Sequence, residues 1–426
     1  MPTRLLYVPT NRRCTDQIAD LATEALLLDG HLALIEHGAA PWSNEHAEAL
    51  ARERAGRGVV ALHMTAAAGS AFLTHLVAGL GLRDSDADRL LALLDPTDVA
   101  YGAGPNKAAL LAAALGAHAL HRRDSDVRVD EWPSGPAYPC VPEMDALGAT
   151  IGHETVAFVG TSTFGSPPHD RRDLLAAGED FVVDIELLAA PDDPRDVLLD
   201  DMRQYLLVDP TIRYTEDFWE LDTVGRTTMG ACAMDGVFLE LPEMPLRQTL
   251  GTDYMRRNVL RYLGKPIVFH SRKLRHDYDI GRATQADLSA VVEYAERDLR
   301  HTVLWPVLTR HHRAIGRSPA DFVAADGSVD RDRYAANIRE SLEQALPTMS
   351  GVPAAFAATY RAAADTVADG RVAARLRAVA GAVASGPDYA AEVANGVEDY
   401  CFLISHWSDL IRTAGQSSAA LDPFYV

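Results

Sequence analysis

Apolar and polar residues alternate in blocks along the start of the chain. Short apolar runs at residues 4–9, 31–38 and 58–64 predict buried strands, because they are too short for helices and are bounded by turn residues. Between them, residues 15–30 and 43–55 carry apolar positions at helical spacing. This β-α-β-α-β order predicts an α/β fold with a mostly parallel sheet, in which ligands bind beyond the carboxyl ends of the strands.

Similar patterns continue through the middle of the chain. We expect helices at 68–80 and 85–94 and a strand at 155–165. Segment 179–188, in which acidic residues alternate with apolar ones, is predicted to be another strand, and segment 193–207 a helix.

From about residue 284 onward the pattern is helical. Apolar faces with a 3.6-residue period predict helices at 285–316, 331–346, 353–368, 372–385 and 388–413. We therefore expect two parts, a sheet-containing domain at 1–283 and a helical region at 284–426. We expect the helical region to close over the active site, to hold a homodimer together, or both. The apolar end of the chain, LDPFYV, is predicted to dock onto a neighbouring surface.

Charge and cysteine content narrow the function classes. The net charge of −20 disfavours extended binding to nucleic acid or to anionic membranes. The four cysteines are spread along the chain without a CxxC pair, so neither a zinc knuckle nor a disulfide framework is indicated. The first apolar run is too short for a signal peptide, and the later runs are interrupted by His, Arg or Asp. We expect a soluble cytoplasmic protein without a membrane span.

The most informative stretch is GPNKAALLAAALGAHALHRRDSD, residues 104–126. A Gly-Pro turn opens a short helix, Gly116 ends it, and AHALHRR is predicted to be a buried strand that leads into Asp124-Ser125-Asp126. In an extended segment, residues i and i+2 point the same way, so both aspartates can face one ion. Carboxylate oxygens are ligands that divalent cations prefer.

This order of asparagine, alanine-rich helix, Leu-Gly-Ala, strand and DSD resembles the centre of GT-A-fold nucleotide-sugar glycosyltransferases. The layout is nearest to that of the mannosylglycerate-type synthases, and the resemblance covers about residues 3–282. It implies a GT-A-like sheet and a metal-dependent transferase that uses Mn²⁺ or Mg²⁺, a GDP- or UDP-sugar donor and a small-molecule acceptor. In that family a DxD motif holds the metal on the donor diphosphate, which would make Asp124 and Asp126 ligands, Asp126 the more direct one. His276, in RKLRHDYDIGR, resembles the third metal ligand of related enzymes, and His270 is its competitor.

The catalytic base implied by the resemblance is Asp253. LGTDY, residues 250–254, opens a helix at the position of the acidic pair of inverting members, whose carboxylate takes the acceptor's proton. Here the pair is Thr-Asp, so only Asp253 can carry this role. A helix cap is the alternative interpretation, and Asp253 has another role if the reaction retains the anomeric configuration.

Other residues near the expected strand ends are predicted to contact the donor. They lie in the first loop, at the end of the second strand, at the start of the alanine-rich helix and beside the DSD motif: Pro9, Thr10, Arg12, Glu36, Asn106, Lys107, Arg123, Asp124 and Ser125. Turn chemistry is the alternative for Pro-Thr-Asn, and a solvated helix start is the alternative for Lys107. The positive charge of Arg122 and Arg123 would also keep the aspartates ionised.

Residues 256–275 are strongly basic, although the chain as a whole is acidic. This segment holds seven basic residues: Arg256, Arg257, Arg261, Lys265, Arg272, Lys273 and Arg275. A departing pyrophosphate needs such positive charge. Basic runs are also common as solvated faces.

The sequence thus predicts a glycosyltransferase, with two alternatives. A sugar-phosphate nucleotidyltransferase shares the sheet and the metal acids, but its glycine-rich first loop is missing here. A non-catalytic binding protein of the same fold is the other. The chain has no GxGxxG after its first strand and no GxxxxGK[ST], which argues against dinucleotide and P-loop chemistry.

Overall fold

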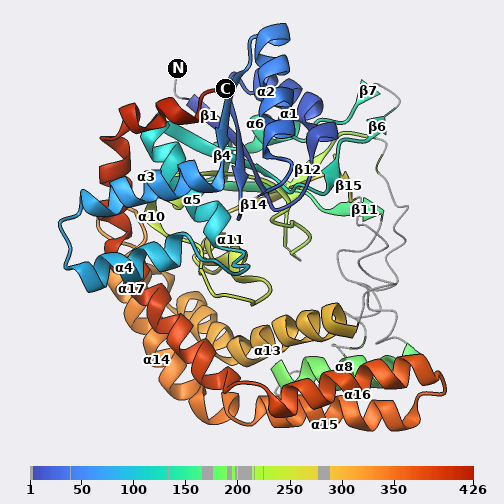
Figure 1. Ribbon diagram of the computed structural model, residues 1–426. Helices are drawn as coiled ribbons and strands as arrows, with labels where there is room; N and C mark the ends of the chain where they lie inside the picture. Colours follow the sequence, from blue (N-terminus) through green and yellow to red (C-terminus); the bar gives the residue numbers. More distant parts are fainter. Residues whose placement is uncertain are drawn as a thin grey trace.

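The structure is a computed structural model. It describes residues 3–38, 40–132, 135–165, 176–189, 194–196, 199, 214, 216–223, 225–276 and 288–426. An α/β part is built on a large sheet, and a group of long C-terminal helices packs below it (Figure 1). The predicted α/β class is confirmed.

The main sheet has eight strands in the order β12-β14-β10-β13-β4-β1-β2-β3. Their bounds are β1 Thr3–Thr10, β2 His31–Glu36, β3 Val60–Met64, β4 Ala117–Arg123, β10 Phe158–Gly160, β12 Trp219–Leu221, β13 Ala231–Asp235 and β14 Ile267–His270. β13 and β12 run antiparallel to their neighbours, whereas the other paired strands are parallel. The order 3-2-1-4 reverses between β1 and β4, and open α/β sheets bind ligands at such a switch point.

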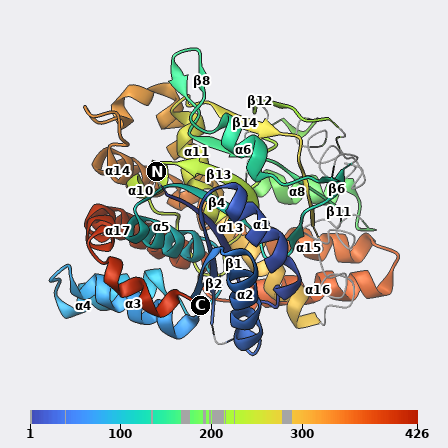
Figure 2. The ribbon, with the colours of Figure 1, turned by 90° about the horizontal axis from the view of Figure 1, so that it is seen from above.

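Alternation along the strands divides the core into two layers. Leu5 and Tyr7 of β1 belong to a large cluster on one face of the sheet, and Leu6 and Val8 belong to a second cluster on the other face. Helices α1 Ile18–Leu27, α2 Ser43–Arg57 and α6 Cys140–Ala146 cover the smaller cluster. Helices α3 Ala66–Ala78, α4 Asp84–Leu94 and α5 Ala103–Leu115 lie on the opposite face (Figure 2).

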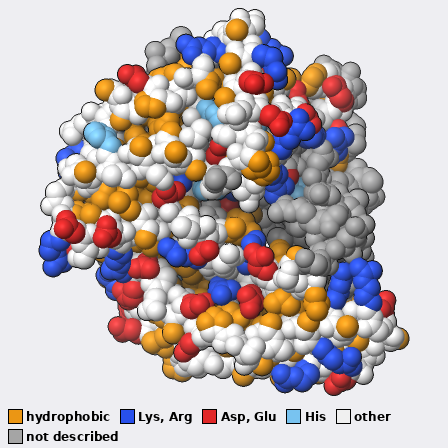
Figure 3. All heavy atoms as spheres, viewed as in Figure 1, with side chains coloured by type: hydrophobic (Ala, Val, Ile, Leu, Met, Phe, Trp, Pro, Cys, Tyr) orange, Lys and Arg blue, Asp and Glu red, His pale blue; other side chains and the backbone are white. Residues whose placement is uncertain are grey.

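The C-terminal helices match the predicted pattern closely. They are α13 Leu288–Arg317, α14 Arg331–Met349, α15 Val352–Thr366, α16 Gly370–Ser385 and α17 Tyr389–Gly415. Helix α17 packs along α5, and one continuous apolar cluster contains residues of both the sheet and these helices. The expected boundary between 283 and 284 lies outside the described residues. In the view of Figure 1, the surface is hollowed between the α/β part and the helices below it (Figure 3).

The predicted strand at 179–188 is wrong, because these residues form helix α8, Glu179–Ala189. Its apolar residues pack against α13 and α15, and Phe181 meets Tyr360 edge to face with 5.0 Å between ring centroids. Tertiary contact has therefore overridden a local alternation that suited a strand. Most of the predicted helix at 193–207 lies outside the described residues.

Smaller elements position the loops at the switch-point edge. Strands β11 Thr163–Gly165, β15 Leu274–His276 and β5 Val127–Arg128 form a three-stranded sheet that pairs His276 with Val127. The two-stranded pieces are β6 Glu131–Trp132 with β7 Gly135–Pro136, and β8 Thr150–Ile151 with β9 Glu154–Thr155. The short helices are η1 Thr15–Gln17, α10 Val237–Glu240, η2 Thr252–Tyr254, α11 Met255–Tyr262, η3 Pro319–Phe322 and η4 Ser418–Phe424.

The end of the chain docks onto the sheet edge, as predicted. Phe424 is buried edge to face against Phe72, with 5.6 Å between ring centroids, and Tyr425 forms a bridge with Leu62 of β3. No helix in the described part of the chain is long and apolar enough to cross a membrane.

Candidate functional site

The DSD motif lies at the sheet's switch point, directly after β4. The Asp124 backbone N–H donates to the Gly230 carbonyl at 2.9 Å, and Gln17 Nε2 donates to the Ser125 carbonyl at 2.8 Å. The loop is therefore held from both sides. The side chain of Asp124 is 34% exposed and that of Asp126 is 15% exposed, so both carboxylates retain access to the outside.

The carboxylate of Asp126 lies close to two other predicted site residues. Arg12 Nη1 donates to Asp126 Oδ2 at 2.6 Å, and His276 Nε2 lies 3.7 Å from Asp126 Oδ1. The structure therefore brings residues 12, 126 and 276 together. The oxygens of Thr10 are used locally, because its hydroxyl bonds the backbone of Arg12 at both N–H and carbonyl. Thr10 thus supports the turn-chemistry alternative.

Arg122 is a site residue for which the sequence suggested only a general electrostatic role. Its Nε donates to Asp124 Oδ1 at 2.9 Å and its Nη1 donates to Asp253 Oδ2 at 2.7 Å. One buried guanidinium therefore links the motif aspartate to the predicted base. The signal in the sequence is alternation along β4, since neighbouring residues point to opposite faces of the sheet. Arg122 consequently faces this site and Arg123 faces away from it.

Gly230 shapes the other side of Asp124. A Cβ atom added at this residue would lie 2.7 Å from Asp124 Oδ2, which is closer than side chains approach one another. The absence of a side chain at Gly230 lets the second oxygen of Asp124 lie close against this residue. Gly230 immediately precedes β13.

Asp253 lies in η2, directly before α11. It is nearly buried, and burial raises its pKa while the neighbouring Arg122 opposes that rise. Glu243 is the carboxylate that caps α11, because it accepts hydrogen bonds from the N–H groups of Met255 and Arg256. Burial raises the pKa of Glu243 to about 8. Asp253 is therefore not the cap of this helix, and its carboxylate points to Arg122.

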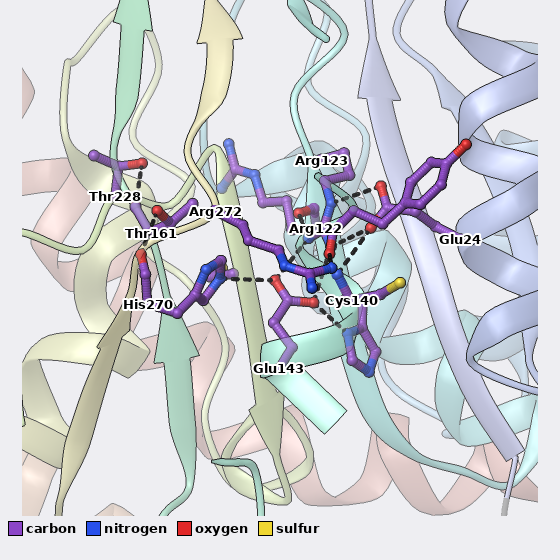
Figure 4. Close-up of polar contacts among 12 residues, drawn as sticks. Glu24, Arg122, Arg123, Cys140, Glu143, Thr161, Thr228, His270 and Arg272 are labelled. Carbon is purple, nitrogen blue, oxygen red and sulfur yellow. Dashed lines mark hydrogen bonds and ion pairs between the residues drawn. The ribbon is translucent and has the colours of Figure 1, made fainter. Parts of the chain in front are cut away.

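Arg123 does not contact the donor site, and that prediction is corrected. Its guanidinium is buried behind the sheet and pairs with Glu24 at 2.7 Å and Glu143 at 2.9 Å (Figure 4). Glu143 also meets His121 Nδ1 at 2.7 Å and lies 3.9 Å from His270 Nε2. Figure 4 shows that these side chains point toward one another from β4, α1, α6 and β14. His270, the competitor ligand, therefore belongs to this network.

Asn106 and Lys107 are also placed differently from the prediction. The Asn106 amide is fully buried and bonds both the N–H and the carbonyl of Glu243, at 2.7 and 2.8 Å. Lys107 is buried and pairs with Asp95 at 2.5 Å. Both side chains fasten α5 to its neighbours, so neither is oriented toward a phosphate at the strand ends.

Glu36 is buried as well, at the end of β2. Its carboxylate meets His46 Nδ1 at 2.8 Å, His63 Nε2 at 2.9 Å and the Ser43 hydroxyl at 2.7 Å. Burial would raise the pKa of Glu36, but these hydrogen bonds lower it to about 2. The prediction that Glu36 contacts the donor is corrected, because its oxygens are already used inside the protein.

Glu36, His46 and His63 form the only group of metal-ligand side chains among the described residues whose ligand atoms all lie within 4.8 Å of one another. The backbone N–H of Cys14 donates to His46 Nε2 at 3.1 Å. A neutral ring then carries its proton on Nδ1, which faces Glu36. A metal at that nitrogen would have to displace this proton, so the arrangement favours a proton-sharing group. Asp124, Asp126 and His276 do not form such a compact group.

Most cations of the basic segment 256–275 are neutralised within the fold. Arg257 donates to Thr227 and lies 3.5 Å from Asp222, Lys265 pairs with Glu154 at 2.6 Å, and Arg272 pairs with Asp217 at 2.7 Å. Arg256 is fully buried and donates to the carbonyl of Leu241. The interpretation of the whole run as a phosphate-neutralising surface is therefore corrected.

A family model matches residues 4–422, which is nearly the whole chain. The chain therefore belongs to the family of unknown function DUF6271. No curated protein matches it.

Proposed function

We propose that the protein is a metal-dependent glycosyltransferase that moves a sugar from a nucleoside-diphosphate sugar to a small-molecule acceptor. The observation that carries the proposal is the convergence of Asp124, Asp126, His276 and Asp253 at one strand edge, although these residues are up to 152 positions apart in sequence. That edge is the switch point, where open α/β sheets bind nucleotides.

The donor set suits a hard divalent cation. Asp124 and Asp126 offer carboxylate oxygens, and His276 offers an imidazole nitrogen, which together match Mn²⁺ or Mg²⁺. The side chain of Asp124 is 34% exposed, so an ion can reach it from outside. When bound, such an ion would supply charge stabilisation for the departing nucleoside diphosphate. Arg12 occupies only Oδ2 of Asp126, whereas Oδ1 faces His276. The guanidinium of Arg12 therefore lies beside the ion's site, where it would also meet the phosphates.

Asp253 is the base in this proposal. A general base works best with a pKa near the working pH, and burial moves the pKa of Asp253 upward in that direction. The hydrogen bond from Arg122 fixes the orientation of its carboxylate. The carboxylate would then take the proton of the acceptor hydroxyl.

A thermal-shift screen with UDP, GDP, ADP and dTDP, each with and without Mn²⁺, tests the proposal. We expect one nucleotide to stabilise the protein only when Mn²⁺ is present. At about 100 times the dissociation constant, it should add about 2.7 kcal/mol. Asp126→Ala should abolish the shift, whereas Asp365→Ala, an exposed control in α15, should keep it.

One observation favours a second candidate, a non-catalytic binding protein of this fold. Both motif aspartates already have arginine partners, Arg122 for Asp124 and Arg12 for Asp126. A nucleotide shift that needs no metal and survives Asp126→Ala would favour this candidate over the transferase.

A further inference from the structure

The chain has three lysines, Lys107, Lys265 and Lys273, and only one of them has no carboxylate partner among the described residues. Lys107 pairs with Asp95 and Lys265 with Glu154, at 2.5 and 2.6 Å. Lys273 makes no hydrogen bond or ion pair through its ammonium group within the described part of the chain.

Lys273 is nevertheless 91% buried, since only 9% of its surface is exposed. Its Nζ lies 5.0 Å from the centre of the Tyr214 ring. Burial lowers the pKa of this lysine, and the nearby positive charge of Arg226 lowers it further. The Tyr214 ring meets the Phe269 ring edge to face, with 6.2 Å between centroids, and Arg226 lies over Phe269. Both cations therefore border one aromatic cluster, where water compensates their charges poorly.

Arg226 is only partly neutralised. Its guanidinium lies 4.2 Å from the centre of the Phe269 ring, and one nitrogen, Nη2, pairs with the exposed Glu220 at 2.5 Å. Its Nε is buried and has no hydrogen-bond partner among the residues that the structure describes. A buried donor left without an acceptor costs free energy, so an acceptor oxygen bound at this atom would be stabilising.

A third cation lies beside this pair. A Cβ at Gly225, the residue before Arg226, would lie 2.9 Å from Arg261 Nη1. The Arg261 guanidinium therefore lies against the same segment of backbone. No carboxylate pairs with Arg261 among the described residues.

The position of these residues in the fold is that of a ligand site. Lys273 follows the carboxyl end of β14 and precedes β15, which carries His276. Arg226 lies in the segment that leads through Thr228 to Gly230, beside Asp124. Both cations are therefore at the same edge of the sheet as the DSD motif, on the other side of Gly230.

We propose that Lys273 and Arg226 form a binding site for an oxyanion, either a phosphate or a carboxylate group of a small molecule. An oxyanion would relieve the repulsion between the two cations and accept the free hydrogen of Arg226 Nε. Lysine acts as a point charge toward phosphate, and arginine adds directed donors. This inference does not depend on the transferase proposal, because it requires neither a metal nor a sugar.

Because the chain has only three lysines, the reactivity of Lys273 can be followed directly. The purified protein is treated at pH 8 with the N-hydroxysuccinimide ester of acetic acid, and acetylation of each lysine is followed by peptide mass spectrometry. Inorganic phosphate or pyrophosphate should slow acetylation of Lys273. At about ten times the dissociation constant, the protection should be about ten-fold, because a bound site is withdrawn from reaction. Lys265 is the internal control, and sodium chloride at equal ionic strength controls for screening.

Two variants distinguish anion binding at this site from a general effect of the protein's charge. Arg226→Gln should remove the protection of Lys273, whereas Arg339→Gln, which breaks an exposed ion pair in α14, should leave it intact. Protection by UDP or GDP would assign the site to the donor's phosphates. Protection by orthophosphate or citrate, but by neither nucleotide, would assign it to an acidic group of the acceptor. Equal acetylation of Lys273 with and without every one of these anions would overturn the proposal.

Discussion

Whether Asp124 and Asp126 can bind a ligand depends on the groups that already contact their carboxylate oxygens. Asp124 is held by Arg122 through one oxygen, and its other oxygen lies close against Gly230. Asp126 is held by Arg12. Each carboxylate thus has a cationic partner and at least a narrow opening, which suits a group that exchanges an internal partner for a ligand.

Replacing Gly230 tests the close contact between this residue and Asp124. The Cβ of Gly230→Ala would push against Asp124 Oδ2, the end of a half-exposed side chain that can move. We expect a stability change within about 1 kcal/mol, because the neighbour yields, but loss of the metal-dependent nucleotide shift. Gly381→Ala in α16 is the matched control, since nothing lies within 4 Å of its added Cβ. This control should gain about 0.5–1 kcal/mol and keep the shift.

Glu36 makes a second prediction at this scale, on pH dependence. Its pKa is 4.5 in the unfolded reference and about 2 in the folded protein. The depressed value means that its contribution to stability is fully present above pH 4.5 and is lost as the pH falls toward 2. Glu36→Gln should therefore cost up to about 3 kcal/mol at pH 7 and much less at pH 3.

Urea unfolding of the wild type and Glu36→Gln at pH 7, 5 and 3 measures this difference. A constant difference over the whole range would contradict the assignment. Because His46 Nδ1 carries a proton toward Glu36, we also expect EDTA to leave the melting temperature unchanged. A drop in melting temperature that zinc restores would show instead that the Glu36 group holds a metal.

At the scale of elements, strand β4 carries two arginines with opposite uses. Arg122 faces the candidate site, whereas Arg123 joins α1, α6 and β4 behind the sheet. A buried cation between two buried carboxylates is costly to remove, because it leaves charges without compensation.

We therefore expect Arg123→Met to destabilise the protein by about 3–5 kcal/mol, measured by urea unfolding or, if the variant does not fold, by soluble yield. A triple variant that also carries Glu24→Gln and Glu143→Gln should recover much of this loss, because no buried charge is then left unpaired. Arg339→Ala, which breaks an exposed pair, should cost less than about 1 kcal/mol. Similar stability for Arg123→Met and Arg339→Ala would contradict this account of the network.

Element types were largely predictable from the sequence, whereas the partners of polar side chains were not. Strands β1 to β4 and helices α13 to α17 follow apolar periodicity, a local property that survives in any context. Helix α8 was missed because its short alternating pattern fits a strand equally well. Asn106, Lys107 and Arg123 were misplaced because a polar residue near a strand end can face either the cleft or the interior. That choice depends on contacts with Glu243, Asp95 and Glu143, which are distant in the sequence.

The candidate site shows the same division. The position of Asp124 and Asp126 followed from the strand before them, whereas the 3.7 Å distance from His276 Nε2 to Asp126 Oδ1 depends on the pairing of β15 with β5. Arg122 and Asp253 are 131 residues apart in the sequence, and their hydrogen bond depends on how β4 and η2 are placed in the fold. The proposed site of Lys273 and Arg226 likewise could not be predicted from the basic segment 256–275, because Arg226 lies outside that segment.

At the scale of the whole molecule, the sheet and the C-terminal helices share one core. Trp407 of α17 is fully buried and donates its indole N–H to the carbonyl of Phe238 at 3.2 Å. Tyr400 donates to the carbonyl of Pro242, so α17 is joined to the loop after α10. Helices bound in this way are expected to unfold together with the sheet.

Hydrogen exchange followed by mass spectrometry tests this expectation. Protected amides of β4 and α17 should open with the same free energy and the same dependence on urea, because both report global unfolding. Peptides from exposed ends such as residues 385–388 provide the fast-exchanging reference. Opening of α17 at clearly lower free energy than β4 would show two independent units.

The docking of α17 and the terminal segment also bears on how the protein is made. Helices α3 and α5 leave the ribosome early, but the surfaces that cover them, α17 and Phe424, are synthesised much later. During translation, the nascent sheet therefore presents an apolar face with no cover, a state that invites aggregation and chaperone binding. Slow elongation over the codons of α17 and of residues 418–424 would lengthen that exposure, so yield in a host should depend on codon choice there.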